Sequence, residues 1–395
     1  MKTVLLVVAG AADRPVAELG GRTPLEAAAT PRLDRLAREG RVGHVLPVPE
    51  GLRPEEGAFA LGLLGLDPRQ HVDLGAAMDA AALDVPLGSL DQAFRLSLVT
   101  ADRETLHDAS AGHIRHDEAV LLLTALAEAC RAADLLLVPG PRGRGVLVWR
   151  GARDVRVQTV PPTEVLGRSL RAALPRGTGI GHILQLIDRS RELFATHEVN
   201  ELRRDLGENP ATLVWPWGPG VAQPLPSLHE RLGLRGAFVG VEPSMRGLAR
   251  LQGMHLAEVP GATGLPGTDL AGKAAAACAL LADHDLVVVH VDSTAAASRT
   301  RDFVSKVEDL ERIDSQLVTP LAAHLEGLPD TRLLVVGGEA ISVETGRHLT
   351  DPVPFALWEP AKPWPGRGAF SEEGTREGGI EVAASHHLLE LAFKM

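Results

Sequence analysis

Short runs of apolar residues, each bounded by Gly, Pro or Asp, recur along the chain. Within each run the apolar residues are continuous rather than alternating, which is typical of parallel strands covered on both faces. Helical patterns lie between the runs, so the order of the elements predicts a doubly wound α/β core. The predicted core strands are 3–10, 211–218, 236–242, 285–292 and 332–339, and the predicted helices include 31–40, 267–284 and 305–327.

The middle of the chain has a different pattern, with shorter strands in which polar and apolar residues alternate. Its predicted elements are strands within 91–114 and 145–162 and helices at 115–134 and 181–207. The change predicts an inserted α+β cap at 89–205, between core segments at 1–88 and 206–395. The Pro-rich stretch 352–368 is interpreted as a surface loop, and the charged stretch "RRDLGE" at 203–208 as solvated surface.

The composition restricts the partners and the compartment. The 395 residues carry a formal net charge of -11, which disfavours nucleic acid and an anionic membrane as partners. Two cysteines, Cys130 and Cys278, lie in helical patterns and form neither a disulfide framework nor a thiolate metal motif. The apolar run near the N-terminus has the length of a strand, so we expect neither a signal peptide nor a membrane span. A cytoplasmic protein is the simplest expectation.

Long motifs rich in Gly and Pro are distributed over nearly the whole chain. They include "AADRPVAELGGRTPLEAAATPRLDRLAREG" at 11–40, "LGLLGLDP" at 61–68, "NPATLVWPWGPG" at 209–220, "GTDLAGKA" at 267–274 and "DPVPFALW" at 351–358. In this order the motifs resemble those of the archaeal-type cofactor-independent phosphoglycerate mutases, metalloenzymes of the alkaline phosphatase superfamily. The resemblance implies an alkaline-phosphatase-like α/β core with an inserted cap. It also implies that two divalent metals, such as manganese or zinc, activate a serine that moves a phosphoryl group between positions of phosphoglycerate.

The side chains that the resemblance implies as metal ligands are substituted in this chain. Ala9 stands in place of an Asp after the first strand. Ala295 and Arg299 replace an Asp and a His that are four residues apart, and Gly338 and Glu339 replace an Asp-His pair. We therefore interpret these five as vacated metal positions and expect no bound metal.

Two further positions complete this comparison with the family. Glu56 occupies the position of the nucleophilic serine, so no catalytic residue is assigned. His348 retains a metal-ligand position, but one imidazole without a second protein ligand holds a divalent ion weakly. Two alternatives stay open: Glu56 as an acyl-phosphate nucleophile, and a different single-metal site formed by 338–340 with Asp292 and Asp302.

Arg299 adds a positive charge to a site that has lost acids. It either pairs with Glu56 or Glu339 as a structural substitute for metal, or it binds an anion bidentately. An arginine that the family places soon after its nucleophile is Gly75 here. The residues that could bind an anionic ligand are Arg14, His113, Arg144, Lys273 and Arg299.

These substitutions predict a catalytically silent relative of the mutases. Such a protein would act as a scaffold, as a partner subunit or homo-oligomer, or as a binder of a phosphorylated or acidic small molecule between core and cap. Two alternatives remain: an active metal-dependent mutase that interconverts 3- and 2-phosphoglycerate, and altered phosphoryl chemistry in the same cleft.

Overall fold

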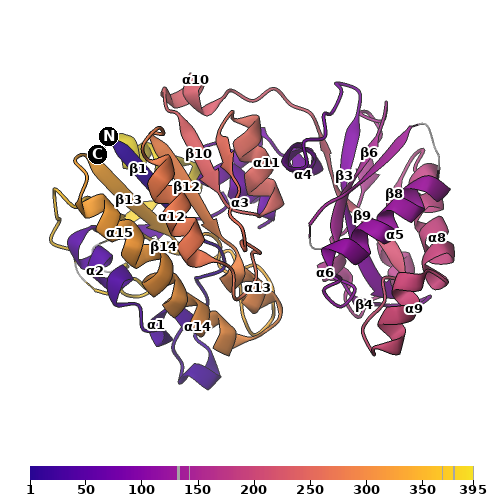
Figure 1. Cartoon of the computed structure of the whole chain (residues 1–395), viewed down its shortest axis with the longest axis horizontal. Coiled ribbons are helices and arrows are strands. Elements are labelled where there is room, and N and C mark those ends of the chain that lie inside the picture. Colours follow the sequence, from indigo (N-terminus) through magenta and orange to yellow (C-terminus); the bar gives the residue numbers. More distant parts are fainter. Residues whose placement is uncertain (131–133, 142, 367, 377–378, 395) are drawn as a thin grey trace. The chain divides into compact units, whose positions relative to one another are not determined.

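The chain folds into two compact units. The computed structural model describes residues 1–130, 134–141, 143–366, 368–376 and 379–394. One unit contains Met1–Val72 and Leu225–Met395, and the other contains Asp73–Pro224 (Figure 1). The boundaries expected at 88/89 and 205/206 therefore lie inside the second unit.

An eight-stranded mixed sheet forms the centre of the first unit. Its strands, in spatial order, are β11 (His255–Ala257), β10 (Gly236–Val239), β12 (Leu286–Val291), β1 (Lys2–Val8), β13 (Thr331–Val336), β14 (Val353–Trp358), β2 (Arg41–Val45) and β15 (Ile380–Val382). The first five run parallel to one another, β14 is antiparallel to both of its neighbours, and β15 is parallel to β2. The residues of β12 and β13 are buried throughout, as the continuous apolar runs predicted.

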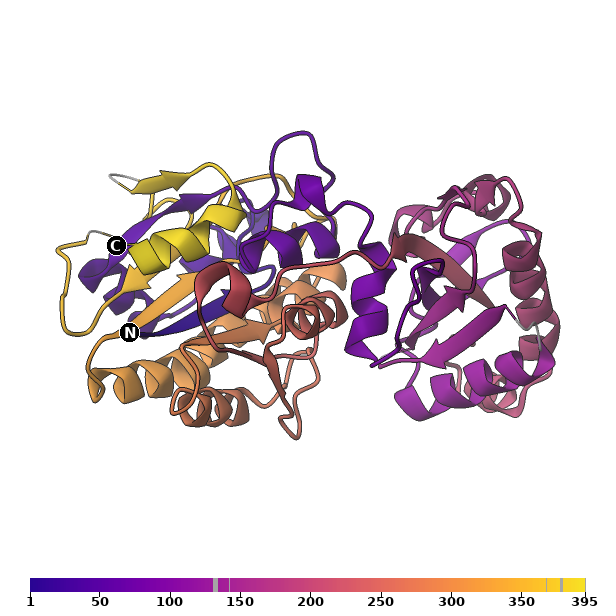
Figure 2. The ribbon, with the colours of Figure 1, turned by 90° about the horizontal axis from the view of Figure 1, so that it is seen from above.

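Helices cover both faces of this sheet. In Figure 2 the C-terminal helix α16 lies on one side of the strands, and the orange helices α12 to α15 lie on the other. The bounds are α1 (Pro24–Ala27), α2 (Pro31–Glu39), α3 (Glu56–Leu63), α10 (Leu228–Leu232), α11 (Pro243–Leu251), α12 (Leu270–Leu280), α13 (Ser293–Arg299), α14 (Phe303–Ile313), a π-helical turn (Asp314–Val318), α15 (Thr319–Glu326) and α16 (Leu388–Lys394), with short 3₁₀ turns at Ala17–Leu19, Pro68–Gln70 and Ser385–His387. The predicted doubly wound α/β core is confirmed.

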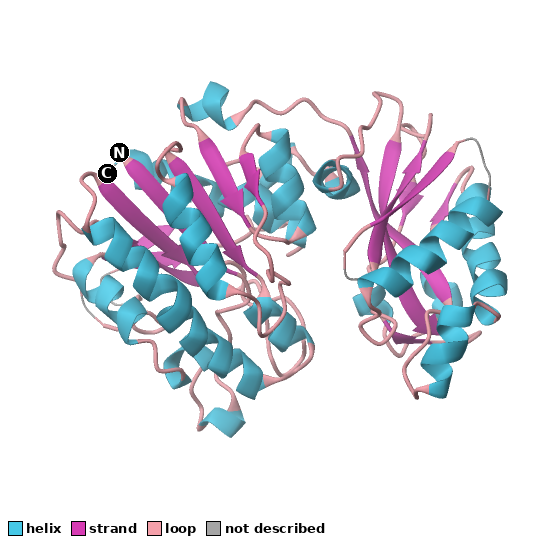
Figure 3. Ribbon diagram, viewed as in Figure 1, coloured by secondary structure: helices cyan, strands magenta, loops and turns pink. Residues whose placement is uncertain are grey.

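The second unit is an α+β fold with helices on its sheet (Figure 3). Its main strands are β4 (Leu106–Asp108), β3 (Gln92–Ala101), β6 (Arg144–Trp149), β5 (Leu135–Pro139) and β9 (Leu213–Val221), and β7 (Val157–Gln158) pairs with β8 (Arg176–Gly177). Its helices are α4 (Gly75–Ala82), α5 (His116–Ala129), α6 (Pro162–Val165), α7 (Leu170–Ala173), α8 (Gly181–Ala195) and α9 (Glu198–Asp205). The strand face that contains Phe94 and Leu147 packs with α5 and α8, whereas α4 covers Ala93 and Val146.

The structure corrects two of the expected elements. The run 211–218 was expected in the core sheet, but it forms β9, which pairs antiparallel with β3 in the second unit. The stretch 352–368 was interpreted as a surface loop, but its first part is the buried strand β14 between β13 and β2. Residues 131–133 of the predicted helix 115–134 and residue 367 of the predicted loop lie outside the described residues.

Two smaller expectations are also answered. Cys130 and Cys278 are free thiols, as their isolated positions predicted. Among the residues that the structure describes, no helix has the length and apolarity needed to cross a bilayer.

Candidate functional site

The carboxyl ends of the three central parallel strands bring several of the predicted site residues together. Ala9 follows β1, Asp292 follows β12, and Glu339 comes three residues after β13. Ligand sites of open α/β sheets lie at this edge, because the loops after parallel strands meet there. Ala9, Asp292 and Glu339 therefore meet at one edge of the sheet.

Apolar side chains and close backbone contacts occupy the centre of this edge. Ala9, Ala295 and Ile341 are fully buried and pack against one another. A Cβ atom on Gly10 would lie 2.6 Å from the Cα of Ala295. Gly338 has a φ of +64°, and a Cβ there would lie 2.8 Å from the Cα of Ala9. These contacts leave no space for a longer side chain at Gly338 unless the backbone moves.

A buried ion pair holds the segments on either side of this apolar cluster. The Nζ atom of Lys306 lies 2.7 Å from Oδ2 of Asp13 and also donates to the carbonyl oxygen of Ile341. The same Asp13 oxygen accepts from the backbone N–H of Val343. Lys306 and Asp13 thus tie the chain after β1 to the segment that contains Ile341. The sequence interpretation missed this pair, because two distant charged residues carry no local signal of their pairing.

Arg299 links two carboxylates beside the apolar cluster. Its Nη2 lies 3.1 Å from Oε1 of Glu56, and its Nη1 lies 3.7 Å from Oδ1 of Asp292. Glu56 is the first residue of α3, and Arg299 is the last residue of α13. An acid at a helix N-terminus and a base at a C-terminus both interact favourably with the peptide dipoles. The predicted pairing of Arg299 with Glu56 is confirmed.

Two further titratable groups of the site are neutral near pH 7. Burial raises the pKa of Glu339 to about 8; Arg299 opposes this shift, while Asp292 and Glu56 add to it. Burial lowers the pKa of His348 to about 4, and Arg299 lowers it further. The ring of His348 lies 5.3 Å from the ring of Phe59, and its buried Nδ1 has no hydrogen-bond partner among the described residues. The site thus suppresses one negative charge on Glu339 and one positive charge on His348.

The space left among these residues is small. A cavity of about 10 Å³ is lined by Glu56, Phe59, Ala60, Leu63, Glu242, Met245, His290, Asp292, Arg299 and Glu339. That volume corresponds to roughly one water molecule.

Comparisons with known proteins identify the family. The sequence pattern of the 2,3-bisphosphoglycerate-independent phosphoglycerate mutases matches residues 37–200. The phosphoglycerate mutase of Methanothrix thermoacetophila is 35% identical over 392 residues, which are 99% of each chain. A probable phosphoglycerate mutase of Geobacter sulfurreducens is 33% identical over 396 residues, also 99% of each chain. The chain belongs to the 2,3-bisphosphoglycerate-independent phosphoglycerate mutase family.

Two solved structures share the fold of this chain. A protein of Pyrococcus horikoshii superposes with a TM-score of 0.78 at 25% identity, over 100% of this chain and 96% of that chain. The cofactor-independent phosphoglycerate mutase of Thermoplasma acidophilum has the same fold, with a TM-score of 0.61 at 24% identity over 100% and 99% of the two chains.

The residues at the sheet edge do not fit the two divalent metals that the mutase resemblance implies. No three His, Cys, Asp or Glu side chains within the described residues are arranged to hold a metal ion. Asp302, considered above for a single-metal site, accepts hydrogen bonds from Ser305 at the start of α14. Ala9, Ala295 and Gly338 carry no ligand atoms in their side chains, and Arg299 places a cation next to the carboxylates. The donor set at this edge therefore does not support a catalytic step through a pair of metals.

The four other residues proposed for anion binding lie apart from Arg299 or belong to the second unit. Arg14 is exposed and pairs with Asp351 at 2.9 Å. Lys273 is fully buried, and its Nζ donates to the carbonyl oxygen of His290, so it has a structural contact instead of an open position for a ligand. Arg144 begins β6, and His113 is an exposed residue before α5.

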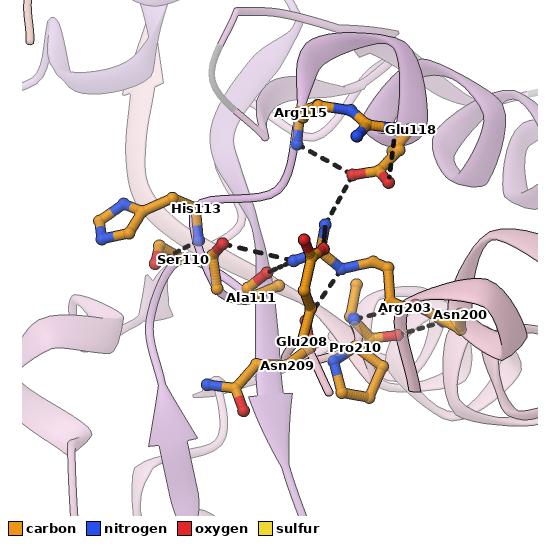
Figure 4. A network of polar contacts seen from close by, with 12 residues as sticks. Ser110, Ala111, His113, Arg115, Glu118, Asn200, Arg203, Glu208, Asn209 and Pro210 are labelled. Atoms are coloured by element: carbon orange, nitrogen blue, oxygen red, sulfur yellow. Dashed lines mark hydrogen bonds and ion pairs between the residues drawn. The ribbon is translucent and has the colours of Figure 1, made fainter. Parts of the chain in front are cut away.

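The second unit contains a buried network centred on Arg203, shown in Figure 4. The Arg203 Nη1 atom lies 2.6 Å from Glu118 and 3.0 Å from Glu208, and Nη2 donates to the carbonyl oxygen of Ala111. Its Nε donates to the carbonyl oxygen of Asn209. Arg203 was interpreted as solvated surface within "RRDLGE", and this was wrong. A signal was available, because Val199, Asn200 and Arg203 share one face of α9.

Proposed function

We propose that this chain is a non-catalytic member of the phosphoglycerate mutase family. The observation that carries the proposal is the close packing of Ala9, Ala295 and Gly338 at the positions where the family resemblance implies metal ligands. Phosphoryl transfer by two dications requires them to neutralise the phosphoryl oxygens and to activate a hydroxyl. Here one guanidinium replaces the dications, and a carboxylate, Glu56, replaces the hydroxyl.

The expected loss of activity is large. A bound metal contributes several kcal/mol to stabilisation of the transition state, and about 1.4 kcal/mol changes a rate tenfold. Loss of one metal alone therefore removes roughly a thousandfold in rate. The carboxylate of Glu56 also repels a phosphoryl group when no metal is present.

We further propose that the protein binds a small phosphorylated or acidic molecule without converting it. The second unit supports this part of the proposal, because its loop at 111–113 is held in an uncommon conformation. Ala111, Gly112 and His113 have φ values of 49°, 65° and 52°. Two hydrogen bonds hold the loop in this conformation. Arg203 donates to the carbonyl oxygen of Ala111, and Asp108 accepts from the N–H of Gly112. Strained loops that are fixed in this way are common at ligand-binding positions.

A metal analysis and an activity assay test the proposal. The purified chain is incubated with Mn²⁺ or Zn²⁺, desalted, and analysed for metal by mass spectrometry; we expect less than stoichiometric metal. The same samples are assayed for conversion of 3- to 2-phosphoglycerate, with the Methanothrix thermoacetophila relative as the positive control. We expect no turnover above the sample without enzyme. Turnover by the unaltered chain would establish the second candidate, metal-dependent mutase activity, which the 35% identity to that relative favours.

A further inference from the structure

A second cavity lies at the opposite edge of the core sheet. It has a volume of about 450 Å³ and is lined by Ser227, Leu228, His229, Leu234, Arg235, Gly236, Gln252, Gly253, Met254, His255 and His284. β10 begins at Gly236, β11 begins at His255, and the two strands are parallel. The cavity therefore lies at the amino ends of these strands, whereas Asp292 and Glu339 follow the carboxyl ends of theirs.

The lining combines an apolar floor with groups that donate hydrogen bonds. Leu228 and Met254 are buried and lie against Gly236, where an added Cβ would meet both side chains. His229, Arg235 and His255 are exposed around them. None of the described residues that line the cavity is acidic. In a protein with a formal net charge of -11, a concave region lined by three histidines and an arginine favours a negatively charged ligand.

Two of the histidines are fixed relative to each other. The rings of His255 and His284 are stacked, with centroids 5.5 Å apart. Nδ1 of His284 lies 2.9 Å from the carbonyl oxygen of Leu280, so Nδ1 is the protonated nitrogen of that ring. Asp285, which lies 3.5 Å from the Arg235 guanidinium, and Glu230, which interacts with His229, are opposing charges beside these groups.

The wall of the cavity also contains an unsatisfied donor. Gln252 is 1% exposed, and its Oε1 accepts from Nη2 of Arg231 at 2.6 Å. Arg231 can only donate hydrogen bonds, so the atom that it contacts must be the amide oxygen of Gln252. The amide nitrogen, Nε2, therefore points away from Arg231. That Nε2 is buried and has no acceptor among the described residues. A buried donor without an acceptor is unfavourable, so this amide adds local polarity to the wall of the cavity.

We propose that this cavity binds a small organic anion, a carboxylate with an apolar body. The apolar part would cover Leu228 and Met254, and the carboxylate would accept from Arg235 and from the ring N–H groups of His229 and His255. A volume of about 450 Å³ is within the range of ordinary small-molecule sites. This proposal does not depend on whether the protein has mutase activity.

Calorimetric titration of the full chain with benzoate tests the proposal. Benzyl alcohol serves as the neutral probe of similar shape, and inorganic phosphate serves as the anion without an apolar body. We expect benzoate to bind more tightly than either. The double variant His255→Ala/His284→Ala should weaken benzoate binding about tenfold or more, since it removes the stacked rings and the hydrogen-bond donor of His255 from the lining. The matched control is His324→Ala, which changes an exposed histidine on α15 that does not line the cavity.

Nuclear magnetic resonance of the histidine side chains gives a readout that does not depend on variants folding. In the unaltered chain, benzoate should shift the imidazole resonances of His255 and His284 and leave those of His324 unchanged. Equal binding of benzyl alcohol would overturn the requirement for an anion. If only phosphate bound, the ligand would not need an apolar body. If none of the three probes bound, the proposal would be wrong.

Discussion

Arg203 in the second unit and Arg299 in the first are both held by carboxylates, but in different surroundings. The Arg203 side chain is 2% exposed, and each of its three nitrogens contacts a glutamate or a backbone carbonyl. The Arg299 side chain is 26% exposed and lies between Glu56 and Asp292, while the neighbouring Glu339 has its pKa raised to about 8. Arg203 and Arg115 together match the charges of Glu118 and Glu208, and the hydrogen-bond donors of Arg203 all have acceptors. Arg299 lies among more acids than one cation neutralises.

The two clusters differ in how completely the charges within them are compensated. The Arg203 network fixes backbone carbonyls, so it serves the fold of the second unit. The acids around Arg299 retain a like-charge repulsion that a more positive centre would relieve.

The largest expected effect comes from breaking the satisfied network. Arg203→Met leaves Glu118 buried without its partner, so we expect the free energy of unfolding of the second unit to fall by about 3 to 5 kcal/mol. Chemical denaturation followed by tryptophan fluorescence measures the change. The control is Arg204→Ala in the same helix, where the side chain is exposed and the expected change is within about 0.5 kcal/mol. A loss below about 1 kcal/mol for Arg203→Met would remove the contrast between the two arginines.

The next effect is a dependence of stability on pH that originates from Glu339. Its pKa in the folded protein, about 8, is raised above the ordinary value of 4.5, so its stabilising contribution is present at low pH and is lost as pH rises through about 8. His348 acts in the opposite direction, because its folded pKa of about 4 lies below 6.5 and its contribution is lost as pH falls below about 6.5. Between pH 6.5 and 8, Glu339 is therefore the member of this pair that changes stability.

The variant Glu339→Gln isolates this contribution. From pH 6.5 to 8 the free energy of unfolding of the unaltered protein should decrease by about 2 kcal/mol through Glu339, and the Gln variant should lack this decrease. Denaturant titrations at both pH values measure it, with the exposed Glu344→Gln as the control. Parallel pH profiles for the unaltered protein and Glu339→Gln would show that Glu339 is ionised throughout and would contradict the description of a site with excess acid.

The sequence predicted those parts of the structure that depend on local pattern. The strands β1, β10, β12 and β13 were predicted because a strand covered on both faces is continuously apolar. The pairing of Arg299 with Glu56 was predicted because a base had appeared where acids had been lost. Both inferences needed only the residue types and the family resemblance.

The parts that failed depend on which element pairs with which. The run that forms β9 has the same apolar pattern as a core strand, and its pairing with β3 is decided by tertiary contacts. Gly75 and Gly220 show these contacts, since a Cβ on Gly75 would lie 2.0 Å from the carbonyl oxygen of Pro219 and a Cβ on Gly220 would lie 2.1 Å from that of Leu74. This close approach of α4 to β9 places both elements in the second unit. The second unit therefore spans Asp73–Pro224 instead of the expected 89–205.

A smaller effect tests whether the vacated metal position is closed. Gly338→Ala should destabilise the first unit by roughly 1 to 3 kcal/mol, because φ is +64° and the new Cβ would press on the Cα of Ala9. Gly233→Ala is the matched control, since its φ is +69° but no atom lies within 4 Å of an added Cβ. The difference between the two variants reports the crowding alone. If Gly338→Asp were as stable as the unaltered chain and bound manganese, the site would be open and the proposed loss of catalysis would be wrong.

The smallest expected effect concerns the nucleophile position. Glu56→Ser removes the partner of Arg299, but it also removes one acid that raises the pKa of Glu339, so the two changes oppose each other. The pair is partly exposed, with side chains 26% and 14% accessible, and we expect a change in unfolding free energy of at most about 1 kcal/mol.

The same variant should show no conversion of 3-phosphoglycerate with added Mn²⁺, because a serine hydroxyl without metals has no means of losing its proton near pH 7. The matched variant Glu56→Gln has a similar size to glutamate and separates loss of charge from loss of volume. Turnover by Glu56→Ser but not by Glu56→Gln would mean that a single residue separates this chain from an active mutase, and the difference between the two arginine clusters would then have no bearing on catalysis.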